Sequence, residues 1–292
     1  MPRLTANGIQ IEYETQGDPK GPPMLLIMGL GAQLITWDDG FCDELVARGF
    51  HVIRYDNRDS GLSDKMESAG PANIMAAYAG EEQPAYTLDD LADDAVGVLD
   101  ALHIPAAHIV GASMGGFIAQ LVAINHPDRT LSLTSIMSGP SGEDTVSPTP
   151  EAGAFLVRAP GPTREEVVAL GIESRHLLGG VNNPFDVDLE RQKIGRAYDR
   201  MYYPEGYGRQ LVAVLTAKTR VPALAHVKVP TLVVHGIDDP LVPVENGRRV
   251  AAAVPGARLI ELEGMGHNVP PQYWPVVADA IAETAARAVA VK

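Results

Sequence analysis

The sequence predicts an α/β fold in which a mostly parallel, eight-stranded sheet is flanked by helices and carries an inserted helical cap. Three observations lead to this prediction. Short apolar runs alternate with segments of helical periodicity over most of the 292 residues. The alternation stops between about residues 139 and 220 and then resumes. A turn of small residues, Gly111-Ala112-Ser113-Met114-Gly115-Gly116, joins one apolar run to a helical segment.

The first strands are predicted to form an antiparallel edge of the sheet. Residues 3–6 and 9–14 alternate apolar and polar side chains on either side of Asn7-Gly8, which is a strong hairpin signal. The next apolar run, residues 24–28, is uninterrupted and therefore typical of a strand that is covered on both faces. It ends in Gly29-Leu30-Gly31.

The following segment predicts a helix, a strand and a turn. Residues 37–50 carry apolar side chains at helical spacing and close on Arg48-Gly49, a common helix stop. A strand at residues 51–55 follows directly. The turn at residues 56–63 is rich in side chains that bond to their own backbone, so we expect it to have a structural role.

A capped helix leads to the small-residue turn. Thr87 is followed three residues later by Asp90, which is a capping pattern, and the apolar side chains beyond keep a helical spacing. Strands are then predicted at residues 107–110 and 131–137. Because these strands alternate with helices, we expect a parallel sheet with helices on both faces.

The helical cap is predicted from the change in rhythm. Glycine and proline punctuate residues 139–142 and 159–162, and short helical pieces such as 164–178 and 191–201 follow. The predicted organisation is a first core segment (1–139), a helical cap (140–220) and a second core segment (221–292). The cap is aromatic-rich, and aromatic side chains at helical spacing more often pack than bind a ligand. They are Phe155, Phe185, Tyr198, Tyr202, Tyr203 and Tyr207.

The sheet is predicted to resume after the cap. An apolar strand at residues 231–236 is followed by a helix at 244–254 that Pro255-Gly256 stops. The last strand is predicted at residues 258–262, and a terminal helix begins near Trp274.

Composition excludes several classes of protein. The chain is 46% hydrophobic and 21% charged, as in globular proteins, and no apolar stretch reaches the roughly eighteen residues that a membrane span needs. The N-terminus has no apolar signal-peptide core, so a cytoplasmic location is expected. The net charge of −14 repels phosphate backbones and anionic lipid surfaces, so we expect neither nucleic acid nor a membrane as a partner. Cys42 is the only cysteine, which excludes an internal disulfide, and we expect it to be a structural helix residue.

The turn around Ser113 has the features of a nucleophile elbow. A serine hydroxyl is a weak nucleophile that must be presented on a tight turn between a strand and a helix. Such a turn brings the residues two before and two after the serine almost into contact, and Gly111 and Gly115 have no side chain to clash there. The pattern arises by chance in roughly one such chain in ten, so other residues must support the interpretation.

Other reactive side chains are expected at the same edge of the sheet. In a parallel sheet the carboxyl ends of the strands meet, and each of these groups follows a predicted strand. Asp238 and Asp239 follow the strand at 231–236, His267 lies in the glycine-rich loop after the last strand, and Leu30 follows an early central strand. Acyl transfer requires a nucleophile, a histidine base, an acid that orients it and donors for the oxyanion, so all parts are present.

A metal site is the alternative interpretation of the acidic pair. His235 with Asp238 and Asp239 would need a third convergent ligand, and the sequence offers none. We therefore expect no metal and no cofactor.

The order Ser, Asp, His resembles that of the α/β-hydrolases, and the resemblance covers nearly the whole chain. Five segments carry it: Met28-Gly29-Leu30-Gly31, residues 55–63, residues 111–116, residues 235–243 and Gly264-Met265-Gly266-His267. Most members have His-Gly where this chain has Met28-Gly29, and in this the chain is similar to the aclacinomycin methylesterase-like carboxylesterases. The resemblance implies an α/β-hydrolase fold with a cap and a serine hydrolase acting on a carboxylic ester.

The resemblance also implies a role for each site residue. The family spacing of glycine, aspartate and proline places Asp239, rather than Asp238, as the acid that orients His267. Ser113 would be the nucleophile, and the backbone N–H groups of Leu30 and Met114 would form the oxyanion hole. The expected partner is a small-molecule ester, and the chain is expected to act as a monomer or homodimer.

Alternatives stay open at this point. The fold also hosts cofactor-free perhydrolases and carbon–carbon bond hydrolases with the same triad. From a different class, a non-catalytic small-molecule receptor would retain the pocket but would not require all three triad residues.

Overall fold

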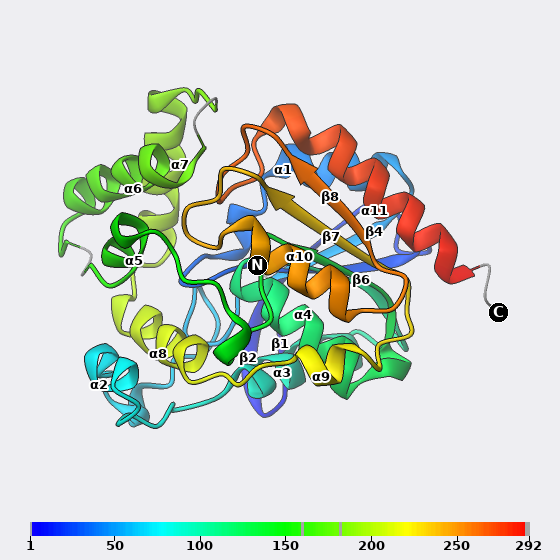
Figure 1. Ribbon diagram of the computed structural model, residues 1–292, viewed down its shortest axis with the longest axis horizontal. Coiled ribbons are helices and arrows are strands. Elements are labelled where there is room, and N and C mark those ends of the chain that lie inside the picture. Colours follow the sequence, from blue (N-terminus) through cyan, green and yellow to red (C-terminus); the bar gives the residue numbers. More distant parts are fainter. Residues whose placement is uncertain (1, 159–160, 181–182, 290–292) are drawn as a thin grey trace.

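The computed structural model describes residues 2–158, 161–180 and 183–289, and within them the sheet has eight strands (Figure 1). The strands are β1 (Arg3–Ala6), β2 (Ile9–Gln16), β3 (Pro23–Ile27), β4 (His51–Tyr55), β5 (Ala107–Ala112), β6 (Thr130–Ile136), β7 (Thr231–Gly236) and β8 (Arg258–Leu262). Their order in the sheet is β1-β2-β4-β3-β5-β6-β7-β8. β1 and β2 are antiparallel, as is the β2–β4 pair, and all other pairs are parallel. The predicted mostly parallel sheet with an antiparallel edge is therefore confirmed.

Helices cover both faces of this sheet. The core helices are α1 (Asp39–Ala47), α3 (Leu88–Ala101), α4 (Met114–Asn125), α10 (Val244–Ala253) and α11 (Trp274–Val289), and a short helix α2 (Ile74–Tyr78) lies beside the cap. Successive strand residues point to opposite faces, so Leu25 packs in the cluster with α3 and α4, whereas Met24 and Leu26 pack with α1 and α11. This two-sided burial explains why the central strands read as continuous apolar runs.

Capping side chains set the helix boundaries. Thr87 and Asp90 form the predicted capping box at the start of α3. The helix predicted at residues 37–50 is shorter, because the Asp38 side chain accepts a hydrogen bond from Gly40 N and starts α1 at residue 39. The helix predicted at 191–201 starts earlier, at Val187, because the Asp186 carboxylate accepts the N–H groups of Asp188 and Leu189.

Among the described residues, five helices lie between β6 and β7; the first four fall in the segment predicted as a cap (140–220), and the last begins at residue 221, in the predicted second core segment. They are α5 (Pro150–Leu156), α6 (Arg164–Leu178), α7 (Val187–Arg200), α8 (Pro204–Leu215) and α9 (Val221–Leu224). Of these, α5 to α8 stand beyond the carboxyl ends of the strands (Figure 1). The predicted cap also contains residues 159–160 and 181–182, which lie outside the described residues.

The two ends of the predicted cap, near residues 140 and 220, lie side by side on the core. Arg220 N donates to Pro140 O (2.9 Å), and the Arg220 guanidinium donates to Gly139 O (3.1 Å) and to Gln120 Oε1 (3.2 Å). Burial lowers the pKa of the Arg220 guanidinium to about 9. These contacts join the two ends of the predicted cap, whose limits at 140 and 220 stay a prediction.

Cys42 lies buried on α1, as expected, and burial raises the pKa of its thiol to about 11. Among the described residues, no helix combines the length and apolar character needed to cross a bilayer.

Candidate active site

Ser113 occupies a sharp turn between β5 and α4. Its backbone has φ 56° and ψ −121°, a conformation that L-residues rarely adopt. A Cβ atom on Gly111 would lie 1.9 Å from Gly115 O, so the two glycines do approach each other as the sequence predicted. A Cβ atom on Gly115 would lie 2.0 Å from Ile27 O on the neighbouring strand, a contact that the sequence did not indicate. Both positions therefore exclude any larger residue.

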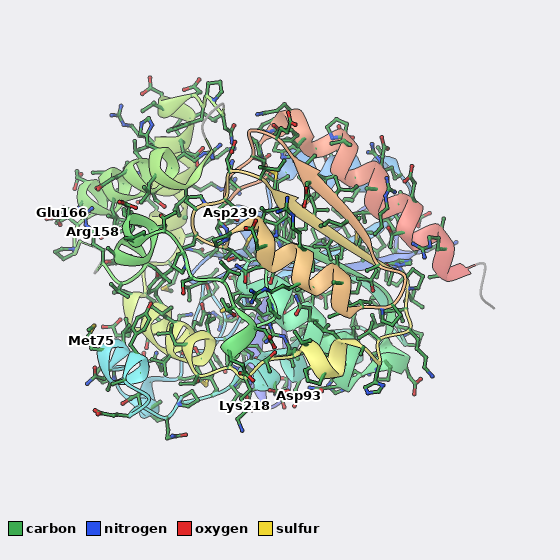
Figure 2. The ribbon with its side chains drawn as sticks, viewed as in Figure 1. Met75, Asp93, Arg158, Glu166, Lys218 and Asp239 are labelled. Atoms are coloured by element: carbon green, nitrogen blue, oxygen red, sulfur yellow. The ribbon has the colours of Figure 1, made fainter. Side chains whose placement is uncertain are left out.

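His267 links Ser113 to Asp239. The distance from His267 Nε2 to Ser113 Oγ is 2.9 Å, and the distance from His267 Nδ1 to Asp239 Oδ2 is 2.7 Å. Asp239 lies in the loop after β7, at the side of the core that faces the cap helices (Figure 2). If Nδ1 carries the proton and donates it to the carboxylate, Nε2 is left free to accept the serine proton. The structure thus brings together the three residues that the sequence selected from different strand ends.

The Asp239 carboxylate is buried and held on both oxygens. Its Oδ1 accepts the N–H groups of Leu241 (2.9 Å) and Val242 (2.8 Å), which leaves Oδ2 for His267. Burial alone would raise the pKa of this carboxyl, but the charge of His267, the nearby His235 ring and hydrogen bonds from His267 and Val242 N lower it to about 2. The carboxylate is therefore ionised at neutral pH. Asp238 instead donates its backbone N–H to Met265 O (3.1 Å).

His235 packs against the Asp239 carboxylate from within β7. It is fully buried on β7, its Nε2 donates to Val242 O (2.7 Å), and the same nitrogen lies 3.6 Å from Asp239 Oδ2. His235 lies within the strand that the sequence predicted at residues 231–236.

Two backbone N–H groups lie beside Ser113 without a protein acceptor. Met114 is the first residue of α4, where the N–H groups of a helix have no acceptor within the helix. Leu30 follows Gly29, on which a Cβ atom would lie 3.0 Å from Ser113 Cβ. In the described part of the chain neither amide donates a hydrogen bond to another residue. The arrangement leaves both available to a ligand oxygen.

The turn after β4 is structural, as expected. Asp56 accepts the N–H groups of Leu34 (2.7 Å) and Leu62 (2.8 Å), and Asn57 donates to Met28 O (2.9 Å). These bonds fix the segment that carries Leu30 to the end of β4.

The aromatic side chains of the cap mostly contact one another or the cap backbone. Tyr198 and Tyr202 stack with ring centroids 4.8 Å apart, and Tyr207 donates to Leu156 O (2.7 Å). Phe185 packs against His176 with ring centroids 4.8 Å apart. These contacts favour the packing role over ligand binding.

The sequence missed the side chains that join the cap to the site. Gln33 donates to the carbonyl groups of Ala197 (2.6 Å) and Met201 (2.8 Å) at the end of α7, and Arg200 donates to Gln33 Oε1 and Asp56 Oδ2 (2.7 Å each). These partners are more than a hundred residues apart, so no local pattern could have indicated them.

Comparison with known proteins gives independent evidence for the family to which the chain belongs. Residues 22–272 match the family model described as the alpha/beta hydrolase fold. The chain is 33% identical to rhodomycin D methylesterase of Streptomyces peucetius, with 98% of both chains covered. It is 28% identical to 3-oxoadipate enol-lactonase 2 of Acinetobacter baylyi, with 89% of this chain and 87% of the relative covered.

Solved structures agree with this fold. The enol-lactonase of Burkholderia xenovorans superposes with a TM-score of 0.74 at 26% identity and covers 99% of this chain and 100% of its own. A meta-cleavage product hydrolase of Pseudomonas fluorescens gives a TM-score of 0.75 at 21% identity, with 99% and 98% covered, and supports the fold alone.

Proposed function

Since this chain belongs to the alpha/beta hydrolase fold family, we propose that it hydrolyses a carboxylic ester through an acyl-enzyme intermediate on Ser113. The observation that carries the proposal is the continuous pair of hydrogen bonds from Asp239 through His267 to Ser113, at 2.7 and 2.9 Å. A nucleophile, a base and an orienting acid in this geometry are what acyl transfer requires.

In the first step, the Ser113 oxygen attacks the ester carbonyl as its proton moves to His267 Nε2. Asp239 Oδ2 accepts the Nδ1 proton, which keeps the ring in the required tautomer and stabilises the imidazolium that forms. The imidazolium then gives its proton to the leaving alcohol.

The negative charge that develops on the carbonyl oxygen is stabilised by the Leu30 and Met114 amides. Their lack of protein acceptors supports this role, because a preorganised donor stabilises the transition state without first breaking another bond. In the second step, water is activated by His267 in the same way and releases the acid from Ser113.

A methyl ester is the proposed substrate class. The support is the 33% identity over nearly the whole chain to a protein named rhodomycin D methylesterase. We propose further that the working unit is a monomer or homodimer in the cytoplasm, which size-exclusion chromatography and cell fractionation would test.

The test compares wild type with Ser113→Ala. A serine-directed fluorophosphonate should label wild type only, and hydrolysis of p-nitrophenyl and methyl esters should fall by about 10⁴-fold or more in Ser113→Ala. The matched control is Ser141→Ala, which changes another buried serine with a positive φ (65°). Hydrolysis that persists in Ser113→Ala would overturn the mechanism, and labelling of wild type without turnover would favour a receptor.

A further inference from the structure

The loop that carries Leu30 is a tight turn. Ala32 N donates to Gly29 O (3.2 Å), so residues 29–32 form a β-turn. Gly31 occupies the third position of this turn and has a φ of +67°. The C=O and N–H of one planar peptide unit point in opposite directions. Because Gly29 C=O points into the turn, the N–H of Leu30 points away from it. The position of this amide therefore depends on the turn keeping its shape.

One side chain of the cap holds the centre of this turn. Gln210 on α8 accepts a hydrogen bond from Gly31 N through Oε1 (2.8 Å) and donates from Nε2 to Arg58 O (2.8 Å). Gln210 is fully buried, and both ends of its amide are used, so its orientation is fixed. The central peptide of a β-turn can flip between two arrangements when glycine occupies the third position. Only the arrangement observed here directs the Gly31 N–H to Gln210.

Helix α8 also packs against the Gly29–Ala32 turn through a second side chain. Tyr207, one helical turn before Gln210, packs on Gly31 so closely that a Cβ atom there would lie 2.6 Å from the ring. The neighbouring residue, Arg209, forms a buried ion pair with Asp59 (2.8 Å), which fixes α8 to the core. The helix is thus anchored independently of its contact with the turn.

We propose that Gln210 is a positioning residue for ester hydrolysis, which acts by holding the Gly29–Ala32 turn so that the Leu30 amide meets the oxyanion. The inference rests on the proposed function, because it requires Leu30 to be an oxyanion donor. Within the described residues, the Gln210 side chain bonds only to backbone atoms of Gly31 and Arg58.

The experiment compares wild type, Gln210→Leu and Gln210→Glu. Gln210→Leu removes the acceptor, and we expect kcat to fall by about 10- to 100-fold with KM changed less than about three-fold, since the oxyanion contact forms mainly in the transition state. Gln210→Glu keeps an oxygen for Gly31 N, and in its neutral acid form it can still donate to Arg58 O, so this variant should recover part of the lost kcat. Affinity for a trifluoromethyl ketone, whose tetrahedral adduct places an oxyanion in the same position, should fall in parallel with kcat/KM. If Gln210→Leu does not fold, Gln210→Met has the same expectation.

Asn246→Leu is the matched control. Like Gln210, Asn246 is fully buried, and its amide group makes two hydrogen bonds to backbone atoms. Both of these bonds go to Val146 (2.8 and 2.9 Å), and neither involves the Gly29–Ala32 turn. Equal losses of kcat in Gln210→Leu and Asn246→Leu, or unchanged ketone affinity, would overturn the inference. Failure of the proposed function gives a different result, because wild type itself would then either resist the fluorophosphonate or be labelled without hydrolysing any ester.

Discussion

The carbonyl oxygen of Leu178 accepts a 2.6 Å hydrogen bond from the backbone N–H of His267. Leu178 is the last residue of α6, and its neighbour Gly179 accepts from Gly266 N (3.3 Å). The carbonyl groups at the end of a helix lack partners within the helix, and here the histidine loop supplies them. The end of α6 therefore holds the loop that carries the proposed catalytic base.

Gly266→Ala tests this contact. A Cβ atom at residue 266 would lie 2.2 Å from Leu178 O and 2.4 Å from Gly180 N, and backbone atoms cannot move aside as a flexible side chain can. The substitution must push the histidine loop away from α6, and a displacement of about 1 Å at a catalytic group can lower the rate about 100-fold. We expect a loss of kcat of that order, measured with a p-nitrophenyl ester.

Gly153→Ala is its control. It adds the same methyl group to helix α5, where the Pro148 side chain, at 3.3 Å, is the one neighbour within 4 Å among the described residues. An equal loss of activity in both variants would show that the contact with α6 has no specific role.

Asp239→Asn tests the orienting acid. An amide in this position would donate to His267 Nδ1 and leave the proton on Nε2, which could then not accept from Ser113. We expect kcat to fall by about 10⁴-fold. Asp238→Asn, the neighbouring change, should leave kcat unchanged, and the opposite result would reverse the assignment of the two carboxylates.

The same variant tests the pH dependence of stability. The pKa of Asp239 is about 2 in the folded protein against 3.8 for the free group. A lowered pKa stabilises the fold above the unfolded value, and this contribution of about 2 kcal/mol is lost as the pH falls through 2. The stability difference between wild type and Asp239→Asn, measured by urea unfolding, should therefore shrink between pH 5 and about pH 2.

The sheet and the triad could be predicted because their signals are local. Strands β4, β7 and β8 begin and end at the predicted residues. β7 is buried along its whole length, as its apolar run predicts, whereas β8 is a partly exposed edge strand whose bounds follow from the glycine and proline turns beside it. The spacing of Ser113, Asp239 and His267 relative to strand ends likewise follows from sequence, because parallel strands place their carboxyl ends together.

The contacts between cap and core could not be predicted. Gln210 and Gly31 are 179 residues apart, and a buried glutamine on an amphipathic helix has no distinguishing pattern. Helix α8 was missed for a local reason: it begins at Tyr203-Pro204 without a capping side chain. The pairing of such segments is decided by tertiary packing rather than by propensity.

Comparing Ser113→Gly with Ser113→Ala measures the strain in the turn. At the positive φ of residue 113, alanine is strained by about 1–3 kcal/mol, and glycine is not. Glycine instead loses about 0.5–1 kcal/mol more than alanine in backbone conformational entropy on folding, which is the smaller of the two costs. Both variants should be inactive, but Ser113→Gly should be the more stable by about 1 kcal/mol, or about 2 °C in Tm. Equal Tm values by calorimetry would contradict the strain.

The buried pair Asp59–Arg209 predicts strong coupling between cap and core. Arg209→Met would leave the Asp59 carboxylate buried without its cation, which typically costs about 3–5 kcal/mol. Burial would raise the pKa of Asp59, but Arg209, Met66 N and the Tyr86 hydroxyl lower it. The double variant Asp59→Asn with Arg209→Met should lose less stability than the sum of the single changes, by about 1–3 kcal/mol in urea unfolding.

Arg164→Met is the matched control for this pair. Arg164 also forms two hydrogen bonds to a carboxylate, that of Asp199, but both side chains are exposed on the cap. Because solvent screens an exposed pair, its loss should not change the unfolding midpoint measurably. Additive losses in the Asp59–Arg209 cycle would count against buried coupling.

His108 predicts a loss of stability in mild acid. The ring is 2% exposed on β5, with its Nδ1 2.8 Å from Ser132 Oγ, and burial lowers the pKa of the imidazole from 6.5 to about 4. Below pH 6.5 the unfolded chain therefore binds a proton that the folded protein does not. Stability should fall by about 1.4 kcal/mol per pH unit, or about 3 kcal/mol in all, before the folded state is protonated as well.

His108→Asn removes the titrating ring and keeps a polar group that can reach Ser132. We expect urea unfolding curves of this variant to lose stability less steeply than wild type between pH 6.5 and pH 4. His103→Asn controls for the loss of one histidine from the unfolded chain, because His103 is exposed and asparagine tolerates its positive φ of 57°. If the stability of wild type and of His108→Asn fell equally with pH, burial would not lower the pKa of His108, and the prediction would be wrong.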